Sequence, residues 1–539
     1  MVCMTLESSA SVSSSASSAE QAERILAGLD ENQARAAQAL SGPVRIIAGA
    51  GSGKTRTITR RIAYACASGA WNPDATLAVT YTNKAAAEMK LRLARMGVHD
   101  VHTSTFHSAA YSQLRRAWRI LSHFESPEIA DPRDLALHAH AAMAHTLQLS
   151  DYTDSEVRDV LQELSWMKVN LLGYEDYERI VGSLGHELPL DLEPRQMLDV
   201  ARAFETEKRR HNVIDFDDCL LLLAHLYENY EDLAEDFRQF MRHITIDEYQ
   251  DVSPLQHLVL TRWLGKNRDI CVVGDPAQTI YSYAGATSYY LLNFAEEFGP
   301  VSHDVQLNTD YRSSGNIVEY ANAVLSGSPS AQSYITLTSP HDAGPRVHLA
   351  KFASDGEEMR GIASRILWHH ARGTALRDVA ILTRTRMRAR DLARACREAG
   401  LAVNLRLDGE NEVLRGAVSG SVGGVAVGAS SEEAGQDGAI TISTIHAAKG
   451  LEWSLVFIPD CHEGNIPFSM EQMMTRSDED ESIEEERRIF YVAVTRGIQQ
   501  VYLCVAQYPF EGGRGVQRTV SRFVRQASNA VRRAHRGKS

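Results

Sequence analysis

The segment that most constrains this chain is a glycine-rich turn between an apolar stretch and a helix-forming one. Val44–Ala48 has the composition of a buried strand, and a helix is expected to begin near Lys54. Small residues let a backbone wrap closely around phosphate groups while its N–H groups point inward. The sequence therefore predicts a phosphate-binding P-loop made of Ala48, Gly49, Ala50, Gly51, Ser52, Gly53, Lys54 and Thr55. An incidental glycine-rich turn is the alternative, and the flanking strand and helix count against it.

A later apolar segment ends in two acidic residues that supply the other half of a nucleotide site. It reads ITIDEYQD, and its apolar start predicts a strand ending at Asp247. P-loop enzymes that hydrolyse ATP need a carboxylate beside Mg²⁺ and a group that activates water. We expect Lys54 to reach the β and γ phosphates, and Thr55 and Asp247 to hold Mg²⁺. Glu248 is the expected general base, whereas Asp251 fits a helix cap equally well.

Strand and helix patterns alternate along most of the chain, which predicts parallel sheets with helices on both faces. Further strands are expected at Thr76–Thr82, His243–Asp247 and Asp269–Asp275. A second set, assigned to a second α/β domain, is expected at Val301–Leu307, Val347–Phe352, Asp378–Thr383, Ile440–Ile445, Leu455–Pro459 and Val501–Val505. Within the first set, between Thr76–Thr82 and His243–Asp247, the residues from about Ser108 to Arg210 have helical patterns alone.

Composition excludes several classes of protein. A chain of 539 residues with 44% hydrophobic and 23% charged residues is expected to form two or more globular domains. No apolar run is long enough for a transmembrane helix, and the first twenty residues do not resemble a signal peptide. The seven cysteines are scattered without CxxC spacing, which favours a reducing, cytoplasmic setting and argues against a zinc site or metal cluster.

The net charge of −13 leaves nucleic-acid binding open. Much of the acidic excess lies in one stretch, residues 478–486, and a DNA groove needs only local positive potential.

Several short motifs resemble, in order, those of the UvrD/Rep/PcrA-type superfamily 1 DNA helicases. They are LDENQ at 29–33, GKTR at 53–56, TYTNKAAAEM at 80–89, TFHS at 105–108, VVGDPAQTIYSYAGA at 272–286, LNTDYRSS at 307–314, TISTIHAAKGLEW at 441–453 and EEERRIFYVAVTRG at 484–497. A single motif of this kind would be weak evidence. The ordered set, from Leu29 to about Val524, covers nearly the whole chain.

The resemblance implies a fold of two RecA-like P-loop domains with the following ranges. The first RecA-like ATP-binding domain is expected at 21–107 and 211–298, with a helical insertion at 108–210. The second is expected at 299–410 and 439–525, interrupted by a flexible loop at 411–438. A disordered Ser/Ala-rich tail is expected at 1–20 and a basic tail at 526–539.

The resemblance also assigns residues around ATP. Gln33 would read the edge of the adenine, and Tyr311 and Arg56 would lie against the nucleotide. Gln278 would lie near the γ-phosphate, and Arg312 and Arg496 would act as arginine fingers. A P-loop carries no catalytic arginine of its own, and such a finger is worth roughly 10³–10⁵ in rate. If both arginines come from the second domain, hydrolysis requires the two domains to close, and the cycle becomes a motor stroke.

The DNA-facing motifs imply a second group of site residues. Phe106 and Tyr283 would stack on bases, at roughly 1–3 kcal/mol per base and with little sequence preference. Phosphates and sugars would be contacted by Thr82, Asn83, Lys84, His107, Thr444, His446, Lys449 and Glu452. Such contacts position DNA without reading its sequence. Outside matching motifs, residues of these types would more often be core aromatics or solvated polar groups.

The sequence departs from the family pattern at a few places. Ala284 stands where many relatives have arginine, Asp310 where asparagine is usual, and Trp453 where phenylalanine is commoner. The larger departure is at 411–438, where full-length relatives carry a mobile helical subdomain that contacts duplex DNA. We therefore hypothesise a motor that translocates on single strands but unwinds weakly, or that is not self-inhibited.

Together these features predict an ATP-dependent 3′→5′ single-stranded DNA translocase and helicase that acts on 3′-tailed duplexes in repair or recombination. A translocase that does not unwind is the first alternative, and the motor part of a helicase–nuclease is the second. No nuclease segment is recognised after Val524. A regulatory nucleotide-binding module without turnover is a third alternative, and the presence of Lys54, Glu248 and both arginines argues against it. Protein partners cannot be named from the sequence.

Overall fold

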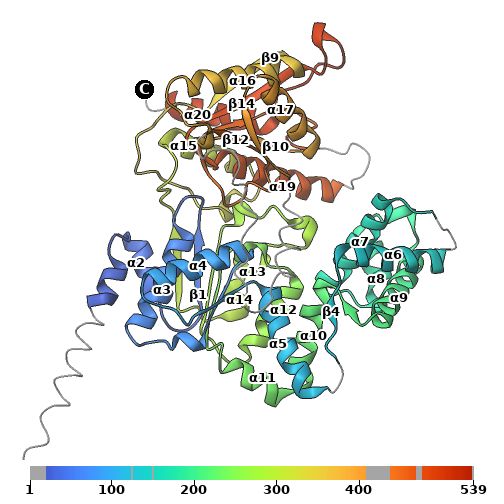
Figure 1. Ribbon diagram of the computed structural model, residues 1–539. Coiled ribbons are helices and arrows are strands. Elements are labelled where there is room, and N and C mark those ends of the chain that lie inside the picture. Colours follow the sequence, from blue (N-terminus) through green and yellow to red (C-terminus); the bar gives the residue numbers. More distant parts are fainter. Residues whose placement is uncertain (1–19, 123–124, 148–150, 408–437, 469–475, 537–539) are drawn as a thin grey trace, which may run out of the picture.

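The computed structural model describes residues 20–122, 125–147, 151–407, 438–468 and 476–536. Its core is a pair of lobes, each built on a parallel six-stranded sheet, and Figure 1 shows one lobe above the other with a helical insertion to one side. The predicted α/β class with parallel sheets is confirmed. The regions predicted at 1–20 and 411–438 lie, apart from Glu20 and Gly438, outside the described residues.

The first lobe is built on a sheet with the strand order β3-β2-β6-β7-β1-β8. Its strands are β1 (Val44–Ala48), β2 (Thr76–Val79), β3 (His102–Ser104), β6 (His243–Ile246), β7 (Ile270–Gly274) and β8 (His303–Leu307). Strand β1 lies between β7 and β8 and has the predicted bounds. The P-loop turn therefore starts from inside the sheet, at the edge where parallel strands present their carboxyl ends.

The strand expected at Val301–Leu307 was assigned to the wrong domain. Strand β8 pairs with β1 along its full length, from Val44 opposite His303 to Ala48 opposite Leu307. Its buried side chains, Val305 and Leu307, belong to the core of the first lobe. The apolar pattern correctly located the strand, but it carries no information about which sheet receives it.

Helices cover both faces of the first sheet. One face packs against α2 (Glu31–Gln38), α3 (Lys54–Ala67) and α4 (Asn83–Arg95), with Ile58, Ile62 and Met89 fully buried. The other packs against α5 (Phe106–Leu121), α10 (Phe216–Asn229) and α12 (Pro254–Leu264). Short helices complete this lobe: α11 (Glu231–Arg238), α13 (Tyr289–Leu292) and α14 (Phe294–Phe298).

The second lobe repeats this plan with the strand order β11-β12-β10-β13-β14-β9. Its strands are β9 (His348–Ser354), β10 (Val379–Thr383), β11 (Ala402–Arg406), β12 (Ala439–Thr444), β13 (Trp453–Ile458) and β14 (Gly497–Tyr508). Helices α16 (Asp355–His370) and α17 (Arg386–Glu398) cover one face. The other face packs against α15 (Gly315–Leu325), α19 (Arg476–Val494) and α20 (Arg522–Arg536).

Helix α20 contains most of the expected basic tail at 526–539, and it packs against the second lobe. Phe523, Val524 and Ala527 are buried against α15 and α19, and Gln526 accepts a hydrogen bond from Arg487 at 2.9 Å. His535, near the end of the helix, pairs with Glu319 at 2.9 Å. The segment is amphipathic, so its apolar positions bind it to the lobe although its charges are on the surface.

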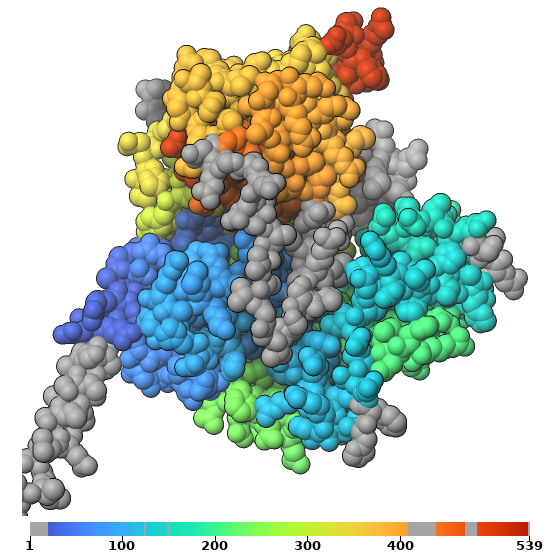
Figure 2. All heavy atoms as spheres, in the orientation of Figure 1, coloured from blue at the N-terminus to red at the C-terminus, as the bar shows by residue number. Residues whose placement is uncertain are grey.

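The helical insertion begins later than predicted. Helix α5 (Phe106–Leu121) belongs to the first lobe, because Ala110 and Ala117 pack into that core. The chain leaves through β4 (Glu128–Ile129) and returns through β5 (Val213–Ile214), which pair in parallel. The helices between them share a separate core, and they are α6 (Pro132–Leu147), α7 (Asp154–Val169), α8 (Tyr174–Leu184) and α9 (Pro194–Arg210). Figure 2 shows this region standing beside the first lobe.

Among the described residues, no helix is both long and apolar enough to cross a membrane.

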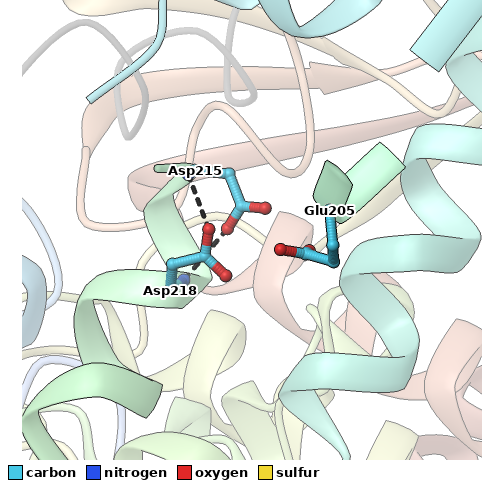
Figure 3. Close-up of side chains that lie close together, drawn as sticks. All are labelled: Glu205, Asp215 and Asp218. Atoms are coloured by element: carbon cyan, nitrogen blue, oxygen red, sulfur yellow. Dashed lines mark hydrogen bonds between the residues drawn. The ribbon is translucent and has the colours of Figure 1, made fainter. Parts of the chain in front are cut away.

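A buried charge cluster joins the insertion to the first lobe. Glu205 of α9 and Asp215 and Asp218 at the start of α10 point their carboxylates toward one another (Figure 3). The Nζ of Lys168 lies 2.7 Å from Glu205 and 2.6 Å from Asp218, and Lys208 contacts the same three acids. Although burial acts to raise it, these ammonium groups hold the pKa of Asp215 well below its ordinary value. The lysines supply the positive charge that a metal ion would otherwise bring.

Lys208→Ala tests whether this cluster stabilises the joint. Lys208 is 1% exposed, so its loss leaves buried carboxylates with one ammonium group. Breaking a buried pair costs roughly 3–5 kcal/mol, and we expect a loss of about that size in the free energy of urea unfolding. Arg179→Ala, which breaks an exposed pair with Asp176, is the matched control and should cost under about 1 kcal/mol. Equal losses in the two variants would contradict a structural role for the cluster.

Candidate active site

The phosphate turn connects β1 to α3 and depends on two glycines in the left-handed region. Gly51 has a φ of +68° and Gly53 a φ of +78°, which other residues adopt at a cost. A side-chain carbon on Gly51 would also lie 1.9 Å from Asp310 Oδ1. Ser52 closes the turn by donating its hydroxyl proton to the Gly49 carbonyl at 2.8 Å. The turn therefore has the P-loop geometry that the sequence predicts.

The two acidic residues after β6 lie beside this turn. The Nζ of Lys54 is 4.0 Å from Glu248 Oε2, and the Thr55 hydroxyl is 3.4 Å from Asp247 Oδ2. Glu248 has a φ of +53°, a strained conformation for a residue with a side chain. Strain of this kind persists where the surrounding structure fixes a functional group. The structure thus brings together the four residues predicted for phosphate, metal and base.

Adjacent Asp247 and Glu248 have opposite pKa shifts. Burial, together with the negative charge of Glu248, raises the pKa of Asp247 to about 7. Burial also acts to raise the pKa of Glu248, but Lys54 and Lys449 lower it below its ordinary value. Glu248 is therefore ionised at neutral pH, as a general base must be. A proton, or a cation in its place, is favoured on Asp247.

The donor set beside Lys54 fits a magnesium ion. Mg²⁺ prefers hard oxygen ligands from one or two carboxylates or hydroxyls and takes the rest from water and phosphate. Thr55 and Asp247 provide such oxygens 3.4 Å apart, and a cation would offset the cost of ionising the buried Asp247.

Both predicted arginine fingers lie in the second lobe and face the first. Arg496 is 2% exposed, and its Nη2 is 3.4 Å from Oε1 of Gln278, which follows β7. Burial and the nearby charge of Arg312 lower the pKa of Arg496 to about 9. Arg312 is held by Glu452 at 3.1 Å and by the Thr495 carbonyl. Two guanidinium groups therefore lie close to each other beside the phosphate site.

Two of the residues expected around adenine, Gln33 and Tyr311, contact Ser52 and Gly51 of the P-loop. Gln33 is buried, and its Nε2 donates to the Ser52 carbonyl at 2.9 Å. Tyr311 is 41% exposed, and its backbone N–H donates to the Gly51 carbonyl at 3.0 Å. Arg56 donates to the Gly28 carbonyl at 2.7 Å. Binding of a nucleotide base by Gln33 and Tyr311 stays a prediction.

Two of the residues predicted to contact DNA lie in different surroundings from those expected. Phe106 is 5% exposed, and its ring stacks on that of Trp263 with the ring centroids 5.6 Å apart. It is therefore a core aromatic and not a surface on which a DNA base can stack. The ring of His107 packs against Phe216, and burial lowers its pKa to about 4. The TFHS segment starts a core helix here, which explains why its apolar and aromatic residues point inward.

Lys449 and Glu452 are engaged in ion pairs in this structure. Lys449 binds Asp251 of the first lobe at 2.5 Å and donates to the Gln278 carbonyl at 2.7 Å. Glu452 pairs with Arg312. Neither contact fits the role expected from the sequence, in which both residues faced DNA. Asp251 likewise serves an interlobe ion pair, and the cap of α12 is Ser253.

Other predicted DNA residues keep an accessible position or a local structural role. Tyr283 is 47% exposed and its ring lies 6.0 Å from that of His446, so the two lobes meet at this point. Thr82 caps α4 by accepting from Ala85 N, and Asn83 accepts from Ser108. Lys84 is exposed beside them, while Thr444 is buried and accepts from Ala447 N.

Sequence reasoning missed the polar contacts that join the lobes. Besides Lys449 and Asp251, Arg488 donates to the Thr279 carbonyl at 2.7 Å. Glu485 accepts from the backbone N–H of Ser282 at 3.2 Å. Each pair lies inside motifs that were noted, but pairing between residues so far apart has no signal in one sequence.

Geometry and chemistry together define a class of protein: a P-loop ATPase whose phosphate site in one RecA-like lobe is completed by arginines of another. Models of two protein families match the sequence. The UvrD/REP helicase N-terminal domain matches residues 29–299, and the UvrD-like helicase C-terminal domain matches residues 305–410 and 424–508.

Similar proteins agree with these matches. The chain is 34% identical, over 581 aligned positions, to the ATP-dependent DNA helicase UvrD2 of Mycobacterium tuberculosis, covering 93% of this chain and 81% of that protein. It is 29% identical to the ATP-dependent DNA helicase PcrA of Bacillus subtilis, covering 71% of this chain and 51% of that protein. The chain belongs to the UvrD/REP helicase family and is an ATP-dependent DNA helicase.

The raised pKa of Asp247 predicts a pH-dependent effect of Asp247→Asn on stability. In metal-free, nucleotide-free protein, ionising Asp247 is unfavourable, so wild-type stability falls as the pH rises from about 4, the unfolded value, through the folded value of about 7. The neutral Asn removes this cost. We expect Asp247→Asn to have the higher melting temperature at pH 8, with the difference shrinking as the pH approaches 4. A difference that is constant across this range would contradict the shift.

Proposed function

We propose that this helicase uses Mg²⁺-dependent ATP hydrolysis to move 3′→5′ along single-stranded DNA and to open 3′-tailed duplexes, in DNA repair or recombination in the cytoplasm. One observation carries the proposal: Arg496 of the second lobe contacts Gln278 of the first, next to Lys54 and Glu248. A phosphate site divided between two lobes couples each hydrolysis event to their relative position. The direction of movement and the repair role come from the resemblance to the family.

The residues at the phosphates divide the chemistry between them. Glu248 is ionised and would accept the proton of the attacking water, while Lys54 neutralises the β and γ phosphates. Mg²⁺ held by Thr55 and Asp247 would neutralise further phosphate charge. Arg312 and Arg496 would stabilise the charge on the transferred phosphoryl group, which is where arginine fingers act.

Lobe movement follows from this division. Bound ATP adds negative charge between a P-loop on one side and two guanidinium groups on the other, so it favours the closed arrangement of the lobes. Hydrolysis and phosphate release remove that attraction. The contacts Lys449–Asp251 and Arg488–Thr279 join the same two lobes and would change with each cycle.

Residues near the lobe boundary support a DNA path there. Tyr283 from the first lobe and His446 from the second lie together, and the tyrosine is about half exposed. An exposed ring can stack on any base, which suits movement along DNA without sequence preference. Burial lowers the pKa of His446 to about 4, so this ring is neutral at physiological pH and would bind through hydrogen bonds and stacking.

A translocase that does not unwind is the second candidate, and one feature of the sequence favours it. By the resemblance to the family, residues 411–438 stand where full-length relatives carry a helical subdomain that contacts duplex DNA. The two candidates share the ATP chemistry and differ only in strand separation.

Glu248→Gln should separate binding from turnover. The amide keeps the size of the side chain but cannot accept a proton from water, so we expect ATP affinity within a fewfold of wild type and a DNA-stimulated turnover at least about 100-fold lower. Glu235→Gln, at an exposed carboxylate, serves as the matched control and should change neither quantity. Retained hydrolysis in Glu248→Gln would place the general base elsewhere.

A forked-duplex assay tests direction and unwinding. We expect ATP-dependent displacement of strands from 3′-tailed substrates and little from 5′-tailed ones, because movement starts on the tail. Single-strand translocation, measured on a labelled oligonucleotide, gives the comparison rate. Faster displacement from 5′ tails would contradict the polarity, and translocation without displacement would select the second candidate.

A further inference from the structure

Asp30 lies where the adenine-side residues of the two lobes meet. It is the N-cap of α2, and its Oδ1 accepts from the backbone N–H of Gln33 at 2.8 Å. Its own backbone N–H donates to Oε1 of Gln33 at 3.2 Å. Its second oxygen, Oδ2, accepts from the Tyr311 hydroxyl at 2.6 Å. One carboxylate therefore contacts both residues expected to bind the base.

These contacts fix the orientation of the Gln33 amide. Oε1 faces the N–H of Asp30, and Nε2 faces the Ser52 carbonyl at 2.9 Å. A flipped amide would place an NH₂ group against an N–H donor and an oxygen against a carbonyl, so both contacts would become repulsive. Gln33 is 1% exposed, and two backbone groups, the Asp30 N–H and the Ser52 carbonyl, define the orientation of its amide. It retains one N–H and one lone pair for a ligand.

The remaining donor and acceptor match adenine and not guanine. Adenine presents an amino donor at C6 beside the N7 acceptor, whereas guanine presents a carbonyl oxygen at C6 beside N7. An amide whose Oε1 cannot exchange places with Nε2 accepts from the adenine amino group and repels the guanine carbonyl. The fixed orientation of the Gln33 amide therefore favours adenine over guanine, whereas an amide free to flip could bind either base.

Tyr311 extends this network to the catalytic arginine. The residue follows β8 and precedes Arg312, and its backbone N–H is bound to Gly51 of the P-loop. Because its hydroxyl is held by Asp30, the distance between the ring and the Gln33 amide is set by one side chain. With 41% of Tyr311 exposed, a base can still approach the ring.

We propose that Asp30 is a positioning residue for the nucleotide base: its carboxylate holds the Gln33 backbone N–H and the Tyr311 hydroxyl together, so that a base on the Tyr311 ring is presented to the fixed Gln33 amide, and it thereby supports the preference for ATP over GTP. The inference rests on ATP use and on the proposed placement of Gln33 and Tyr311 at the base. It does not depend on DNA binding, direction of movement or unwinding.

Two variants separate this role from a simple helix cap. Asp30→Ser keeps an N-cap oxygen for Gln33 N but cannot reach the Tyr311 hydroxyl. Tyr311→Phe keeps the ring and the cap and removes only the hydroxyl. Loss of a hydrogen bond to a charged group corresponds to roughly a tenfold change in affinity. We expect each variant to weaken ATP binding and raise the KM for ATP by about that factor, with kcat changed less than twofold.

Nucleotide selectivity is the deciding measurement. Equilibrium binding of ATP and GTP, without DNA, should show the ATP preference of both variants reduced about tenfold. The double variant should be no worse than either single one, because both remove the same contact. Glu31→Gln, at the neighbouring exposed acid of α2, is the control and should keep the preference.

The outcomes that overturn the proposal are distinct. If Asp30→Ser lowers the melting temperature but leaves the ATP-to-GTP ratio unchanged, Asp30 is only a helix cap. If Asp30→Ser does not fold, Tyr311→Phe still tests the proposal, because the helix cap is intact in that variant. An unchanged ATP-to-GTP ratio in Tyr311→Phe overturns the proposal. Failure of DNA-stimulated turnover with a normal selectivity result would instead contradict the proposed motor function alone.

Discussion

The contact between the P-loop and the Asp310–Arg312 turn is the constraint on which the rest of the site depends. Asp310 lies against Gly51, and its Oδ1 accepts from the backbone N–H groups of Arg312 and Ser313. The Tyr311 N–H binds the Gly51 carbonyl. The segment that leaves β8 is thus shaped by the phosphate turn itself. Arg312 is the residue after Tyr311, and its guanidinium is held by Glu452 and the Thr495 carbonyl of the second lobe.

Much of this arrangement could be predicted because it is local in sequence. The bounds of β1 follow from one apolar run ending at small residues, and Asp247 and Glu248 follow from another. Parallel strands end at a common edge of the sheet, so residues after each strand are expected to converge. The P-loop, the acidic pair and the placement of both arginines at the lobe boundary could therefore be inferred, the last with the help of family resemblance.

What could not be predicted depends on partners distant in the chain. Val301–Leu307 has the pattern of a strand in either sheet, and its pairing with β1 places it in the first lobe. Phe106 was expected on the surface, but Trp263 provides a core partner that the sequence does not reveal. Lys449 was expected to face DNA, but Asp251 lies on the opposite lobe at ion-pair distance. In each case the residue type was suitable for both roles.

The buried charge cluster at Lys168 and Lys208 has a consequence for the junction between the helical insertion and the first lobe. Because its members come from α7, α9 and the start of α10, and because they are largely shielded from water, neither thermal motion nor salt separates them readily. The insertion is therefore held to the first lobe by charges that dissolved ions screen only weakly, so this junction should keep its strength at high salt.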